Sequence, residues 1–354
     1  MIPNLGPMIL NAYAVLDAFL ALLRLPLGVL VVVLSAYLWR EWRNAASAER
    51  RGSLEDRFYL LFVSAFVLVG LNVVAWPLLY LLLNSYVPEW PGAMCIYGVT
   101  RVGAGSLGVA RFLPGIVTAV QLTKPAIVFL AGAWLVLYRV NRTTTTSQYM
   151  RRVLVALMAF GVMVAADSSL ETLYLAIPKR EEFLSAGCCT AAFDAAEYLS
   201  RFLPQARIPD SFHPWLFAAY YSVHLLQTSL LLGYLYSSGP ERARKWLVAA
   251  LVAAVISVPV AGIFLIEVAA PRLLHLPYHH CVYDLITQAP ESIVALSLFV
   301  GGSFAVGWAC VAAWCANCAE TAAFSRQASC TLARAGVVGY LGSVLMFSIE
   351  LVLA

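Results

Sequence analysis

The sequence has few charged residues for its length, and this shortage excludes a soluble protein. Of 354 residues, 12% are Asp, Glu, Lys or Arg, whereas 62% are hydrophobic. A typical soluble domain has about twice that share of charge. Low charge with high hydrophobicity also excludes intrinsic disorder. The formal net charge of +4 is too small and too dispersed for a nucleic-acid-binding protein.

Several sequence motifs of common enzyme classes are also missing. The chain has no Walker phosphate loop, and its G-x-G-x-x-G match at 103–108 lacks the strand-to-helix context of a phosphate-binding turn, which argues against nucleotide binding. It has neither the H-E-x-x-H of metalloproteases nor the G-x-S-x-G of lipases. Without a C-x-x-C-H sequence, covalent c-type haem is excluded.

What the sequence does contain is a series of long apolar segments. Each is rich in Leu, Val and Ala, lacks the alternation of a barrel strand, and approaches the roughly 20 residues that cross a bilayer. We therefore predict an all-α, polytopic helical bundle that forms a single transmembrane domain over 1–354. The eight predicted spans lie near 25–39, 58–84, 113–138, 153–176, 214–236, 246–270, 292–316 and 333–353.

The first predicted span has an unusual beginning. Residues 7–39 are apolar apart from Asp17 and Arg24. Pro26 follows closely and interrupts the hydrogen bonding of a helix. The sequence therefore predicts an interfacial helix at 7–23, followed by the first crossing.

The basic residues predict the orientation in the membrane. Fourteen of the 23 Lys and Arg residues fall in four of the predicted loops, 40–57, 139–152, 237–245 and 317–334. The positive-inside rule places these loops in the cytoplasm. Both termini then lie outside a plasma membrane of the bacterial inner-membrane type. The three remaining loops, 85–112, 177–213 and 271–291, face outward.

A short internal echo hints at duplication. Cys95-Ile-Tyr-Gly-Val follows the second predicted span, and Cys281-Val-Tyr-Asp-Leu follows the sixth. Both segments are associated with outer loops four spans apart. This spacing is typical of a parallel repeat of two four-span halves.

The predicted outer loops contain half of the cysteines, namely Cys95, Cys188, Cys189 and Cys281. An oxidising exterior favours disulfides, and four thiols can form two. A bridge between the neighbours Cys188 and Cys189 is strained, so Cys95 and Cys281 are their more natural partners. In the alternative interpretation, the same thiols bind a metal.

The densest group of metal donors is His279-His280-Cys281, in the last outer loop. His213 and His275 are further outer histidines, and Met94 adds a thioether beside a cysteine. Thiolate and imidazole donors suit copper or zinc. A haem held by two histidines within the bundle is less well supported, because His224 is the only histidine within a predicted span.

A second group of thiols is predicted at the inner end of the seventh span. Cys315 and Cys318 form a C-x-x-C, flanked by Cys310 and Cys330. This spacing is used by redox pairs and by zinc sites. A small-residue helix end explains it equally well, because Cys packs as a small hydrophobe.

Ionisable residues inside predicted spans form a third candidate, an intramembrane polar cluster of Lys124, Asp167, Glu171 and His224. Lys124 and Asp167 are expected to pair, with Glu171 left nearer the surface. The group can be a buried polar clamp between helices or a path for protons or substrate. His224, with Gln227 one turn away, also suits a packed polar contact.

These features leave four interpretations of function open. The first is metal handling or redox chemistry at an exoplasmic Cys/His site, where His279, His280, Cys281, Cys95, Cys188 and Cys189 are the ligand candidates. The second is a membrane thiol–disulfide oxidoreductase, and the third is a transporter that uses the intramembrane charges. The fourth is a non-catalytic anchor subunit with structural disulfides. The expected partners are the lipid bilayer and a membrane or periplasmic protein.

Overall fold

The computed structural model describes residues 11–44, 48–90, 93–104, 106, 108–144, 147–177, 212–276, 281–315 and 320–353. Throughout these ranges the chain forms helices joined by turns, with no β-strand. The predicted all-α bundle is therefore confirmed. The chain divides into two compact units, Met1–Gly187 and Cys188–Ala354.

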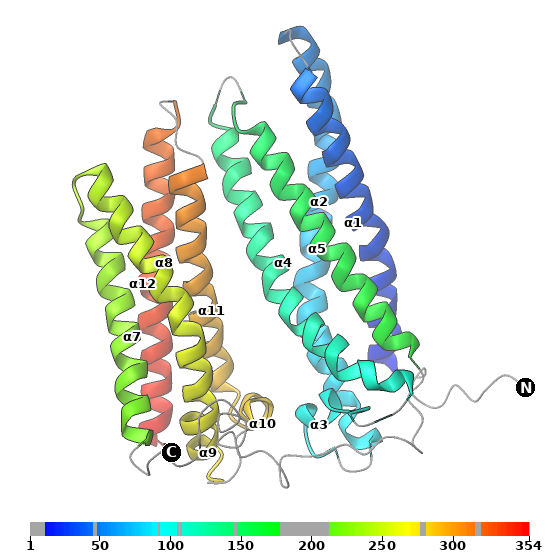
Figure 1. The fold of residues 1–354 in the computed structure, drawn as a ribbon, viewed down its shortest axis with the longest axis vertical. Coiled ribbons are helices and arrows are strands. Elements are labelled where there is room, and N and C mark those ends of the chain that lie inside the picture. The colour runs from blue at the N-terminus through cyan, green and yellow to red at the C-terminus, as the bar shows by residue number, and fades with distance from the viewer. Residues whose placement is uncertain are drawn as a thin grey trace, which may run out of the picture. The chain divides into compact units, whose positions relative to one another are not determined.

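The first unit is built from long helices, coloured from blue to green in Figure 1. Helix α1 packs against α2 and α5, and α4 also packs against α2 and α5. The long helices are α1 (Ala12–Asn44), α2 (Ala48–Ser85), α4 (Leu113–Asn141) and α5 (Met150–Ala176). Three short elements join α2 to α4, namely η2 (Val87–Glu89), α3 (Ile96–Thr100) and η3 (Val109–Phe112).

The second unit also contains four long helices. Helix α7 packs against α8 and α12, and α11 likewise packs against α8 and α12. They are α7 (Phe212–Leu235), α8 (Pro240–Phe264), α11 (Glu291–Cys310) and α12 (Ala322–Leu353). The π-helical turns η6 (Leu265–Ala269) and η7 (Val311–Cys315) extend α8 and α11, and α9 (Ala270–Leu273) and α10 (Val282–Gln288) lie between those two helices in the chain.

The two units share one topology. In each, the first helix packs against the second and fourth, and the third packs against the same two. In each, a short helix preceded by a cysteine lies between the second and third helices, with Cys95 before α3 and Cys281 before α10. Each second helix also contains an internal proline, Pro77 or Pro259. This arrangement supports the duplication that the sequence echo predicts.

The long helices have the properties of membrane spans. Seven helical segments of the described chain are long and apolar enough to cross a bilayer. The eighth long helix, α7, is not among them, because it carries polar side chains such as His224 and Gln227 in its middle. Its 24 residues still extend about 36 Å, more than the hydrocarbon core of about 30 Å. Exposed apolar side chains such as Val255 and Leu345 suit contact with lipid, so the chain is an integral membrane protein.

Helix α1 differs from its prediction, because it continues without a break through Pro26. The expected boundary after an interfacial helix at 7–23 is therefore not present. Gly28 allows α1 to lie directly against α5, where a Cβ added to Gly161 would be 2.9 Å from the Gly28 carbonyl oxygen. Arg24, one helical turn before Gly28, forms ion pairs with two acidic residues of α5. Close packing and these ion pairs hold α1 in place on both sides of the proline.

Candidate functional site

Four ionisable side chains meet inside the first unit. Arg24 of α1, Lys124 of α4, and Asp167 and Glu171 of α5 have side chains that are at most 2% exposed. Asp167 Oδ2 lies 3.0 Å from Arg24 Nη1 and 2.7 Å from Lys124 Nζ. Glu171 forms ion pairs with the same two cations. Each cation therefore faces both carboxylates, and the four charges balance.

The spacing of the acidic residues explains how α5 contributes two of these charges. Asp167 and Glu171 are four residues apart, so they share one face of the helix. The Lys124–Asp167 ion pair that the sequence predicts is present. Glu171, which was expected to remain nearer the surface, instead joins the same cluster.

Neutral side chains complete the shell around the ion pairs. Arg24 Nη1 donates a hydrogen bond to Asn72 Oδ1 at 3.2 Å, and the Asn72 amide donates to the Leu68 carbonyl at 2.7 Å. The Thr123 hydroxyl donates to Asp167. Buried charges need such partners, because an unsatisfied donor or acceptor in the interior costs about 1–3 kcal/mol. The cluster thus joins α1, α2, α4 and α5.

Sequence reasoning did not place Arg24 in this cluster. Its position before Pro26 was interpreted as the boundary of an interfacial helix, where an arginine would meet water. The available signal was a single cation in a long apolar stretch, which has to find a buried partner if that stretch spans the membrane.

Asp17 is a fifth ionisable group inside the same unit. Asp17 is 1% exposed, and neither of its carboxylate oxygens has a hydrogen-bond partner. It precedes Arg24 by seven residues, close to two helical turns, so both side chains lie on one face of α1. From the sequence, Asp17 is only a charged residue within an apolar stretch, with no role assigned to it.

His224 does not belong to the charged cluster, although the sequence grouped it there. It lies on α7, in the second unit, where its Nδ1 is 2.7 Å from the Tyr220 carbonyl oxygen. The aromatic rings of Tyr220, Phe299 and Tyr340 have centroids 4.2, 5.5 and 5.8 Å from its imidazole. Both polar side-chain atoms of Gln227, one turn away, are buried without a hydrogen-bond partner. His224 therefore belongs to an aromatic and polar core separate from the ion pairs.

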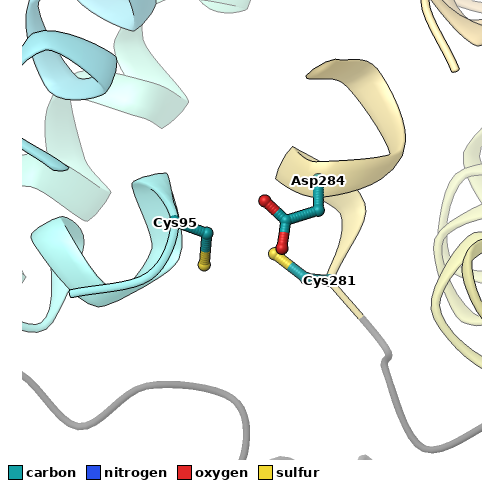
Figure 2. Close-up of side chains that lie close together, drawn as sticks. All are labelled: Cys95, Cys281 and Asp284. Carbon is teal, nitrogen blue, oxygen red and sulfur yellow. The ribbon is translucent and has the colours of Figure 1, made fainter. Parts of the chain in front are cut away.

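The cysteines that begin the short helices are buried. Cys95 is 3% exposed and Cys281 is 5% exposed. Asp284, in the first turn of α10, places a carboxylate oxygen within 4.8 Å of the Cys281 sulfur. Figure 2 shows this thiol and carboxylate, and also labels Cys95 at the start of α3 in the first unit. A thiol and a carboxylate at such a distance can both donate to one zinc ion.

The remaining predicted ligands are only partly covered by the structure. His279, His280, Cys188, Cys189 and Cys318 lie outside the described residues. Only the backbone is described for His213 in α7 and for Cys315 in η7. His275 is exposed just after α9, with a φ of 54°. Cys310 is buried and Cys330 is partly buried.

Comparison with known proteins gives no relative from which a function could be transferred. The chain matches no protein-family model, no curated protein and no solved structure. Its function therefore has to be argued from its own residues.

Proposed function

We propose that this integral membrane protein handles a copper or zinc ion, or performs redox chemistry, at a Cys/His site in its outer loops. The observation that carries the proposal is the buried Cys281 thiol beside the Asp284 carboxylate at the start of α10. His279 and His280 directly precede this cysteine in the sequence, and they supply the imidazoles of the proposed site.

Cys95 is a further donor that the sequence predicts for this site. It occupies in the first unit the position that Cys281 occupies in the second, since each precedes a short helix after the second long helix. Cys188 and Cys189 complete the proposed donor set, and in the disulfide alternative they bridge to Cys95 and Cys281 instead.

Asp284 distinguishes the two metals. Zinc accepts a carboxylate together with thiolate and imidazole, whereas Cu(I) prefers the softer sulfur and nitrogen donors. Asp284 is therefore a ligand if the metal is zinc. With copper, its role is to accept a hydrogen bond from a ligating imidazole and so orient that ring.

The test is metal analysis of the full chain, purified in detergent without chelators. We expect roughly one ion per chain, lost in Cys281→Ser and in His279→Ala with His280→Ala, and retained in Cys330→Ser as the control. Asp284→Asn should lower zinc content more than copper content. Because thiolate and neutral imidazole are the binding forms, metal content should fall as the pH drops below about 6.5, the usual pKa of a free histidine.

Two results would contradict the metal assignment. Unchanged metal content in the double histidine variant would remove these imidazoles from the site. A redox-titratable cysteine pair without any metal would instead favour the thiol–disulfide oxidoreductase.

A further inference from the structure

Among the described residues of the first unit, the buried carboxylates outnumber the buried cations by one. Arg24 and Lys124 are the buried cations of this set, and each is paired with both Asp167 and Glu171. Asp17 is therefore left over, as the third carboxylate against two cations. Its two oxygens have no hydrogen-bond partner, which distinguishes it from the two acids of α5.

Groups from four helical segments interact electrostatically with Asp17. They are Arg24 on its own helix, Asp167, Glu171 and Tyr174 on α5, Lys124 on α4, and Tyr86 just after α2. The two cations of this set are already engaged by ion pairs. An ionised Asp17 would thus be a buried charge without a dedicated counter-ion, the arrangement that a water-free interior disfavours most.

Asp17 also lies near one end of the unit. It is five residues into α1, about 8 Å from the start of the helix. That start is held to the end of α2, where the Asn11 amide donates to the Ser85 hydroxyl at 2.6 Å. Tyr86 and Tyr174 are buried near enough to Asp17 to interact with it electrostatically, and a tyrosine hydroxyl can both donate and accept a hydrogen bond.

We propose that Asp17 is a proton-binding site, in exchange with the medium at the end of the unit that carries the start of α1. A hydronium ion of the medium transfers a proton to one carboxylate oxygen of Asp17: one O–H bond of hydronium breaks, one O–H bond forms on the carboxylate, and water and a neutral acid result. The reverse step returns the proton to water, and no other bond of the protein changes. The balanced cluster of Arg24, Lys124, Asp167 and Glu171 fixes α1 against α5, so that the proton can be gained and lost without rearranging the helices.

Infrared spectroscopy of the full chain in lipid vesicles tests this assignment directly. A protonated carboxylic acid in a dry interior has a C=O stretching band separate from the carboxylate bands. We expect such a band in the wild-type protein, shifted by exchange into deuterated water and by incorporation of ¹³C-labelled aspartate. In Asp17→Asn the band should be lost, and in Glu241→Gln, which alters an exposed carboxylate of the second unit, it should remain.

Either of two outcomes overturns the proposal. A wild-type spectrum without a carboxylic C=O band at any pH at which the protein stays folded means that Asp17 is ionised. A band that ¹³C-aspartate does not shift, or that persists in Asp17→Asn, belongs to another group. The isotope measurement needs only the wild-type protein, so the test does not depend on how well the variant folds.

Discussion

The first prediction concerns how much the ion pairs stabilise the fold, because Asp167 is shared by two cations. In Asp167→Asn, Arg24 loses its partner at 3.0 Å and Lys124 loses its partner at 2.7 Å. Both cations then depend on Glu171 alone. Removing one partner of a buried ion pair costs about 3–5 kcal/mol, since the remaining charge is left uncompensated. We expect Asp167→Asn to lower the free energy of unfolding by an amount in this range.

A double-mutant cycle separates the ion pair from general damage to the core. Lys124→Met alone should also destabilise the fold, because it leaves Asp167 and Glu171 to share Arg24. The double variant Lys124→Met with Asp167→Asn restores a balance of one cation and one paired acid. It should therefore be less destabilised than the sum of the two single variants, by about 0.5–3 kcal/mol.

Thermal unfolding in detergent, followed by circular dichroism, measures these differences. Lys245→Met and Glu241→Gln are matched controls, since both side chains are exposed at the start of α8. The controls should unfold within experimental error of the wild type. Additive effects of the two core substitutions, or single effects as small as those of the controls, would refute the reasoning that Lys124 and Asp167 form a buried pair essential to the unit.

Two further predictions concern packing and orientation. Gly339→Ala should destabilise the second unit by about 1–3 kcal/mol, because the new Cβ would be 2.7 Å from the Gly302 Cα, whereas Gly301→Ala on α11 meets no atom within 4 Å and should be tolerated in the same unfolding assay. In intact cells, a thiol reagent that cannot cross membranes should label Met94→Cys and spare Tyr236→Cys, each in a background without the native cysteines, as both native side chains are exposed and the basic residues assign them to opposite faces. Equal destabilisation by the two glycine variants would contradict the close crossing, and the opposite labelling pattern would reverse the predicted topology.

The local sequence carried most of the information about the helices. Apolar runs longer than a bilayer is thick predict spans whatever their neighbours are, because the backbone can satisfy its hydrogen bonds only within a helix. Even so, hydropathy is a weaker signal for α7, because the middle of this helix contains polar side chains that are buried in the interior of its unit. The echo around Cys95 and Cys281 likewise predicted the repeated topology of the two units.

The candidate sites could be predicted only where spacing along one helix or depth in the membrane was sufficient. Asp167 and Glu171 were placed on one face because four residues make about one turn. The pairing of Lys124 with Asp167 followed from comparable depth in the membrane. Asp284 was expected only as a partner that orients the imidazoles, and its place within 4.8 Å of the Cys281 sulfur follows from α10, which begins directly after the cysteine.

By itself, the sequence determined the class of protein, the approximate spans and the pairing of Lys124 with Asp167. Only the tertiary structure decided how Arg24, Glu171 and Asp17 are placed around that pair. Arg24 could have faced water at an interface, but the close crossing of α1 and α5 brings it to Asp167 and Glu171 and leaves Asp17 without a counter-charge. His224 was separated from this cluster for the same physical reason. Contacts between helices depend on which faces pack together, and hydropathy along the chain does not encode that choice.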